Sequence, residues 1–131
     1  MKRCKKVVVV LAAMIMLGAF TITANAETVE TEEFGTIEYD LFLDESELAS
    51  RGFSTVRAYT TMSNPGTGKV VMTTMDVEIN STGELIATRT DTDSSLAHVH
   101  YDNEDRITLA AFTCHEARNN ESIARYLACI F

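Results

Sequence analysis

A strict alternation of apolar and polar residues between positions 69 and 79 is the feature that most constrains the fold. One face of this segment would carry Val71, Thr73, Met75, Val77 and Ile79. Asp76 and Glu78 would lie on the opposite face. A period of two is typical of a half-buried β-strand, whose successive side chains point to opposite faces of a sheet. Residues 37–43 repeat the pattern, so the sequence predicts at least two such strands.

Turn-forming residues separate these strands from several shorter extended segments. Residues 64–68 read Asn-Pro-Gly-Thr-Gly and include the only proline, and residues 80–83 read Asn-Ser-Thr-Gly, which suits a hairpin loop. Further strands are expected at residues 54–62, 84–90, 96–101 and 106–116, while residues 44–52 interrupt the pattern and have room for one helical turn. About seven short strands predict an all-β fold, which would be an antiparallel sandwich or a small barrel.

The last segment, residues 121–131, fits two interpretations. Ile123, Tyr126 and Ile130 have helical spacing, which would make the fold α+β with a C-terminal helix. As a strand, the segment would place its odd-numbered residues on one face and its even-numbered residues on the other. The strand is preferred, because a turn at residues 121–122 would let the segment pair antiparallel with residues 106–116.

The first 26 residues predict export. Four basic residues among the first six precede an apolar run from Val7 to Phe20, and an Ala-Asn-Ala site ends at Ala26. This order is that of a secretory signal peptide cleaved after Ala26. The 14 residues of the apolar run would give roughly 21 Å of helix, short of the ~30 Å hydrocarbon core of a membrane. We therefore expect a secreted, extracellular protein with no membrane segment in its mature form.

The mature chain would be short and strongly acidic. Cleavage would leave 105 of the 131 residues, enough for one small domain. Residues 27–35 are mostly acidic or threonine, so we expect a flexible leader there, followed by a single β domain over residues 36–131. All 19 acidic residues but only seven of the 11 basic ones would remain, giving a net charge of −12. Such a surface repels polyanions, so nucleic acid and anionic lipid are poor partners.

Two cysteines, Cys114 and Cys129, would remain after cleavage. In an exported chain, an even number of cysteines indicates disulfide bonding. The antiparallel register expected for the C-terminal hairpin places Cys114 directly opposite Cys129, and Ala117 opposite Tyr126. We therefore expect one cross-strand disulfide, provided that the local geometry allows it.

His98 and His100 form the one arrangement with an evident chemistry. Side chains two positions apart on a strand point to the same side, with Cα atoms roughly 6.6 Å apart, so both imidazoles can reach one metal ion. With Glu104 they make the spacing H-x-H-x-x-x-E, which resembles the first metal motif of the cupins, and His115 with Asn119 echoes the second. The glycines that frame the cupin motifs are missing, and the two half-motifs lie too close together for the intervening strands.

The expected hairpin also separates the histidines. A tight turn at residues 102–105 would pair the segment around His98 with the segment around Leu109, leaving His115 roughly 20 Å further along. His115 would then be too distant to complete a coordination shell. We expect His98 and His100 to face solvent, and no cofactor to be bound.

Other chemistries lack a recognisable motif. Acidic loops at residues 91–93 and 102–105 offer oxygen ligands for calcium, but they do not have the spacing of an EF-hand. The sequence therefore predicts a secreted, non-catalytic β domain that binds an extracellular protein or surface ligand, or takes part in an assembly. The alternative is a small metal-dependent enzyme or metal-binding protein that uses His98 and His100, with Glu104 as a third ligand.

Overall fold

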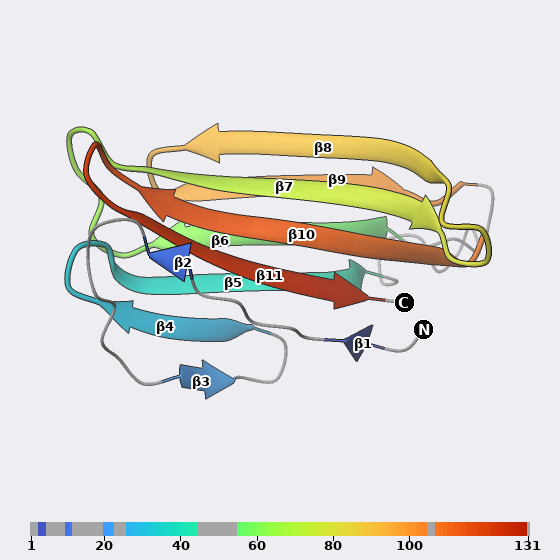
Figure 1. The fold of residues 1–131 in the computed structure, drawn as a ribbon, viewed down its shortest axis with the longest axis horizontal. Coiled ribbons are helices and arrows are strands. Elements are labelled where there is room, and N and C mark those ends of the chain that lie inside the picture. The colour runs from blue at the N-terminus through green and yellow to red at the C-terminus, as the bar shows by residue number, and fades with distance from the viewer. Residues whose placement is uncertain are drawn as a thin grey trace.

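Two antiparallel β-sheets make up the structure, a computed structural model that describes residues 3–4, 10–11, 20–22, 26–44, 55–104 and 107–130 (Figure 1). Sheet A has the order β8 (Leu85–Asp93), β7 (Val70–Ile79), β10 (Leu109–Arg118) and β11 (Ile123–Ile130). Sheet B has the order β9 (Leu96–Asp102), β6 (Thr55–Met62), β5 (Gly35–Asp44) and β4 (Glu27–Thr31). Three short strands extend the far edges: β1 (Arg3–Cys4) and β2 (Val10–Leu11) pair with β11, and β3 (Phe20–Ile22) pairs with β4.

The alternating strands place their apolar side chains between the two sheets. On β5 of sheet B, Tyr39 and Leu41 are each 1 % exposed, and on β7 of sheet A, Met75 and Val77 are 0 % exposed. Side chains from both sheets form two apolar clusters, one around Tyr39 and one around Leu41. The arrangement is therefore sandwich-like, with a core that most strands line with one face.

The all-β fold class predicted from the alternation is confirmed. β11 is a strand rather than the alternative C-terminal helix, and its even-numbered residues Ala124, Tyr126 and Ala128 are buried, while Leu127 is 36 % exposed. No helix occurs in the part of the chain that the structure describes. That part accordingly contains no helix that is long and apolar enough to cross a membrane.

Residues 27–35 differ from the expected flexible leader. They form β4 and the turn into β5, and the ladder between these strands runs from Glu27 opposite Tyr39 to Thr31 opposite Gly35. Within this segment Val29 and Phe34 are 6 % and 2 % exposed. Burial of these two apolar side chains holds the segment in sheet B despite its acidic composition.

The expected hairpin between residues 96–101 and 106–116 is not formed. β9 pairs with β6 in sheet B, whereas β10 pairs with β7 and β11 in sheet A. The prediction was wrong because turn-forming residues do not reveal whether a chain folds back within one sheet or crosses to the other. As a result, His98 lies on an exposed face of sheet B and His115 lies in the core.

The expected disulfide between Cys114 and Cys129 is absent, because the register of the hairpin differs by two residues from the prediction. Cys114 lies opposite Leu127, and Cys129 lies opposite Phe112. The two cysteines share a face of the sheet but are diagonal neighbours, for which Cα atoms are ~7–8 Å apart, beyond the usual limit of ~6.8 Å for a disulfide. Cys114 and Cys129 are not bonded to each other.

The loops rich in glycine and proline lie where predicted. Residues 63–69 join β6 to β7 and carry the chain from sheet B to sheet A, and residues 80–84 close the hairpin between β7 and β8. Gly83 in this hairpin has a φ of 73°, which favours glycine. β8 extends to Asp93, so residues 91–93 belong to a strand and not to a loop. The helical turn expected within residues 44–52 lies outside the described residues.

Candidate functional site

His98 and His100 lie side by side on an exposed face of β9. Their rings are stacked, with centroids 6.0 Å apart. Together with Arg89 and Asp91 of β8 and with Glu104, they line an open polar groove of about 630 Å³. The structure thus brings all three residues of the metal-site alternative into one groove.

The groove offers polar groups but no ready-made metal shell. Among the described residues, no group of three or more His, Cys, Asp or Glu side chains is placed to hold a metal ion. Burial lowers the pKa of His98, and nearby Arg57 and His100 lower it further, while Asp91 acts in the opposite direction. His98 is therefore a neutral imidazole at pH 7. One of its ring nitrogens can donate a hydrogen bond and the other can accept one.

Replacement of both His98 and His100 by alanine is expected to leave the thermal unfolding midpoint nearly unchanged. Exposed side chains without strong partners usually change the free energy of unfolding by no more than about 0.5 kcal/mol. We also expect protein purified without chelator to contain far less than one equivalent of any transition metal, measured by elemental analysis. A stoichiometric metal that disappears in the double variant would contradict both expectations.

At one side of the sandwich, carboxylates of β8 cap backbone donors of β9. Sheet A ends in β8 and sheet B ends in β9, and residues 94–95 join the two strands. Asp91 Oδ2 accepts the backbone N–H of His98 at 3.0 Å, and Asp93 Oδ2 accepts that of Leu96 at 3.2 Å. The hydrogen bonds to Asp93 lower its pKa. Acidic side chains at a sheet edge satisfy backbone donors there and discourage pairing with another strand.

The opposite side of the sandwich is closed in a different way. There sheet A ends in β11 and sheet B in β4, and the additional strands β1, β2 and β3 pair with them. Figure 1 shows these three short strands along the free edges of β11 and β4. All three precede Ala26, the expected cleavage site. We treat the free edge of β11, called here the β11 edge, as the candidate functional site, because cleavage would uncover it.

The hydrogen-bonding pattern of the hairpin between β10 and β11 determines which backbone groups point toward the β11 edge. The N–H of Asn119 donates to the carbonyl of Ser122 at 3.0 Å, so these two residues form a hydrogen-bonded pair. Hydrogen-bonded and non-hydrogen-bonded pairs alternate along an antiparallel ladder. Residues 123, 125, 127 and 129 therefore direct their backbone N–H and C=O groups away from β10, toward the edge. Arg125 is the only charged residue of β11, so little charge opposes an added strand.

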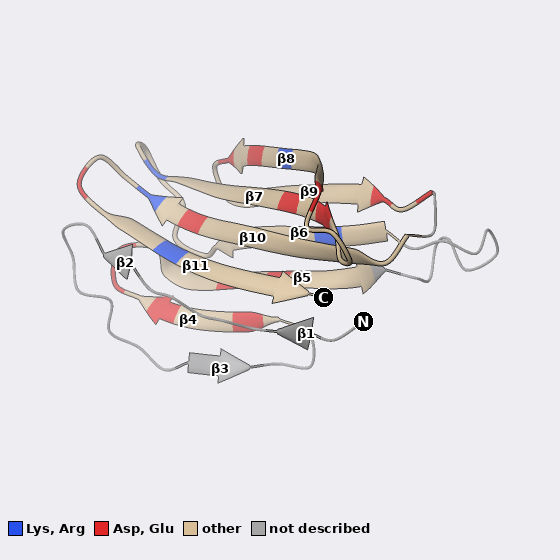
Figure 2. Cartoon of the chain, turned by 45° about the vertical axis from the view of Figure 1, so that its right-hand side comes forward, with Lys and Arg blue, Asp and Glu red and all other residues tan. Residues whose placement is uncertain are grey.

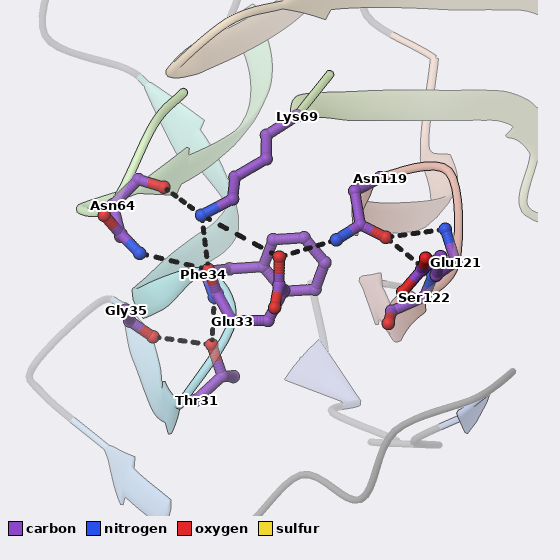
Figure 3. Close-up of polar contacts among 9 residues, drawn as sticks. All are labelled: Thr31, Glu33, Phe34, Gly35, Asn64, Lys69, Asn119, Glu121 and Ser122. Carbon is purple, nitrogen blue, oxygen red and sulfur yellow. Dashed lines mark hydrogen bonds and ion pairs between the residues drawn. The ribbon is translucent and has the colours of Figure 1, made fainter. Parts of the chain in front are cut away.

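Three loops meet around Glu33 at one end of the sandwich (Figure 3). Lys69 Nζ, from the loop between β6 and β7, donates to the backbone carbonyl of Glu33 at 2.8 Å and lies 3.9 Å from its carboxylate Oε1. Asn119 Nδ2, from the hairpin between β10 and β11, donates to the same Oε1 at 2.6 Å. Asn64 Nδ2 donates to the Glu33 carbonyl at 3.1 Å. Glu33 thus bonds to side chains from two loops that are remote from it in sequence.

A chain of hydrogen bonds runs through the core around His115, which is 0 % exposed. Thr113 Oγ1 lies 2.7 Å from the ring Nε2, and Thr60 Oγ1 lies 2.9 Å from Nδ1. Thr60 Oγ1 also lies 2.8 Å from Thr73 Oγ1, and Thr73 donates to the carbonyl of Ala97 at 2.9 Å. Both ring nitrogens therefore have a partner, as a buried histidine requires.

The donor and the acceptor of each hydrogen bond in this chain can be assigned by starting from the bond between Thr73 and the Ala97 carbonyl. Thr73 gives its only hydroxyl proton to a carbonyl, so Thr60 must donate to Thr73 and must accept from His115 Nδ1–H. The ring Nε2 then accepts the hydroxyl proton of Thr113. This pattern assigns a neutral ring with its proton on Nδ1, and burial lowers the pKa of His115 to about 3.

The burial of His115 in the core was not predicted, although the alternation of residues along β10 indicates it. His115 shares its parity with Ala111 and Ala117, which are 0 % exposed and face the core. The alternation of β10 alone would have placed this histidine inside. The loop cluster around Glu33 had no comparable signal, since its members are far apart in the chain.

No protein-family model, curated protein or solved structure matches the chain. The chain is an antiparallel β protein with two sheets. One of its sides is capped by acidic side chains, and the other is covered by its own N-terminal strands.

Proposed function

We propose that the chain is an exported, non-catalytic β-sandwich that acts outside the cell by binding an extended segment of another protein. That segment would add a strand to sheet A along the β11 edge. The observation that carries the proposal is the contrast between the two sides of the sandwich.

This contrast concerns what protects each sheet edge. At the edge formed by β8 and β9, the carboxylates of the permanent residues Asp91 and Asp93 accept backbone N–H groups of residues 95, 96 and 98, and so protect β9 and the turn before it. The β11 edge pairs with β1 and β2, which export would remove together with the leader. Unpaired N–H and C=O groups along a strand are a template for strand addition, a common mode of peptide recognition.

The leader also indicates the chemistry of the partner. Residues 2–6 are mostly basic, and residues 7–11 are four valines followed by a leucine, which favour an extended conformation. The mature chain would carry a net charge of −12, but Figure 2 shows β11 itself with a single basic band and no acidic one. An apolar strand flanked by basic residues would therefore pair with β11 and be attracted by the surrounding acidic surface.

A peptide with the sequence of residues 1–12 is expected to bind the exported protein in trans. We expect binding to be reduced at least about tenfold by Leu127→Pro, a loss of about 1.4 kcal/mol. Proline at this position removes one N–H donor from the β11 edge without removing a hydrogen bond between β10 and β11. Fluorescence anisotropy of the labelled peptide measures the affinity, and Cys4 of the peptide is replaced by serine to prevent disulfide exchange.

Leu127→Thr is the matched control, because it changes the same exposed side chain and keeps the backbone donor. It should bind the peptide nearly as well as the unmodified protein does. Equal affinities of the proline and threonine variants, or no binding to the unmodified protein, would refute strand addition at β11. Rising salt should weaken the binding, because the flanking basic residues contribute electrostatically.

A further inference from the structure

We propose that Lys69 and Asn119 form an intramolecular isopeptide bond, with the Glu33 carboxylate transferring the protons. The bond would join Lys69 Nζ to Asn119 Cγ and release ammonia. This inference depends only on the loop cluster around Glu33 and not on the strand-addition proposal.

Glu33 is placed to serve both reacting groups. Its Oε1 accepts a hydrogen bond from Asn119 Nδ2 at 2.6 Å and lies 3.9 Å from Lys69 Nζ. A single carboxylate oxygen therefore separates the amine from the amide nitrogen that would leave. Figure 3 shows this oxygen between the two side chains. Holding reactants in one site in this way replaces an intermolecular encounter and strongly raises the rate of a slow reaction.

The side-chain amide of Asn119 is polarised for attack. Its Oδ1 accepts the backbone N–H of Glu121 at 2.8 Å and that of Ser122 at 2.7 Å. Two backbone donors on one carbonyl oxygen stabilise the negative charge that develops there in a tetrahedral intermediate. The same contacts fix the orientation of the amide, since only Nδ2 can donate to the Glu33 carboxylate.

The Lys69 amine is largely shielded from solvent and is held by hydrogen bonds. The Lys69 side chain is 17 % exposed and that of Glu33 is 29 % exposed. Nζ also donates to the backbone carbonyls of Glu33 at 2.8 Å and Asn64 at 3.4 Å. The attack would require the Lys69 side chain to rotate away from these carbonyls, past the carboxylate and toward Asn119 Cγ.

The reaction balances without an external reagent. Lys69 Nζ gives a proton to the Glu33 carboxylate, and its lone pair attacks Asn119 Cγ to form the new C–N bond. Glu33 then protonates the amide nitrogen as the Cγ–Nδ2 bond breaks, and ammonia leaves. The ammonia takes up the remaining proton, so the ammonium of lysine and the amide of asparagine become a secondary amide and an ammonium ion.

The bond would tie together parts of the fold that the hydrogen bonds hold only reversibly. It would join the loop between β6 and β7 to the hairpin between β10 and β11. A covalent link across so many residues restricts the unfolded chain, as a disulfide would. Such a link would serve an exported domain in which Cys114 and Cys129 are not bonded to each other.

Intact-mass spectrometry of the exported protein tests the proposal. We expect a mass below the sequence mass by one ammonia, about 17 Da, and a branched peptide after proteolysis that contains both Lys69 and Asn119. The loss should be absent in Lys69→Arg, Asn119→Ser and Glu33→Gln, with circular dichroism showing that these variants keep the β fold.

A neighbouring amide provides the matched control. Asn120→Ser changes an exposed amide in the same hairpin as Asn119 and should retain the loss of ammonia. The full sequence mass after prolonged incubation of folded protein would overturn the proposal. A gain of about 1 Da at Asn119, which indicates hydrolysis of the amide to a carboxylate, would overturn it equally.

Discussion

The free energy of unfolding is expected to fall by about 1.4 kcal/mol per pH unit as the pH drops from 6.5 toward 3, because His115 is buried without charge. The pKa of His115 is lowered from 6.5 to about 3 by burial. Above pH 6.5 the ring is neutral in both the folded and the unfolded protein, so the full stability is present. Below pH 6.5 the unfolded protein takes up a proton that the folded protein does not, and stability is lost down to about pH 3. Small domains have only about 5–15 kcal/mol in total, so this single group makes the protein markedly sensitive to acid.

Comparison with His115→Gln isolates this contribution. Glutamine does not titrate, so the dependence of the unfolding free energy on pH should be less steep by about one proton between pH 3.5 and 6. Urea unfolding followed by circular dichroism at several pH values measures the slope. The control is His100→Gln, which alters an exposed histidine on the outer face of β9 and should keep the slope of the unmodified protein. An unchanged slope in His115→Gln would show that His115 is protonated equally in both states.

Replacement of Tyr39 by alanine is expected to lower the free energy of unfolding by about 3–5 kcal/mol, the range for removal of a buried aromatic ring. Tyr39 is 1 % exposed and stacks on Tyr126, with ring centroids 5.0 Å apart. Its ring also lies 4.9 Å from the ring of His115, and its hydroxyl donates to Glu27 Oε2 at 2.5 Å. The alanine variant therefore leaves a cavity between the sheets and removes a hydrogen bond to a buried carboxylate.

Tyr59→Ala is the matched control on the neighbouring strand β6. Tyr59 is partly exposed, contacts the edge of Phe42 and donates to Glu38 Oε1 at 2.9 Å. Its replacement creates no enclosed cavity, so we expect a cost of less than half that of Tyr39→Ala. Urea unfolding measures both variants at pH 7. Equal costs would mean that the core around Tyr39 does not dominate the stability of the fold.

Local patterns predicted most of the strands because alternation and turn residues act over a few neighbouring positions. The segment that became β7 was predicted over residues 69–79 and is Val70–Ile79, and the strand at residues 54–62 became Thr55–Met62. β4 was not predicted, because the acidic composition of residues 27–35 was given more weight than the apolar side chains of Val29 and Phe34. Those two side chains are stabilising only when the opposite sheet is present to bury them.

The candidate sites could be predicted from the sequence far less well than the strands could, because they require the tertiary structure. The β11 edge could not be predicted while the last segment remained either helix or strand, and its outward-facing groups required the register of the hairpin. The cluster of Glu33, Lys69 and Asn119 joins three loops, and nothing within any one loop indicates the others. The spacing of the histidines predicted that His98 and His100 lie on the same side of their strand, but the groove there also needs Arg89 and Asp91 of β8, which the spacing does not indicate.

Local patterns were sufficient to predict which segments are extended and which face of each one is apolar, because side-chain direction in a strand follows from position alone. They were not sufficient to predict which strands pair, in which register, and in which of the two sheets. Pairing depends on contacts between distant residues, so a shift of two positions keeps every side chain on its face yet separates Cys114 from Cys129. The crossing from β9 to β10 likewise placed His115 in the core and left His98 outside, because a connection between sheets leaves no local pattern.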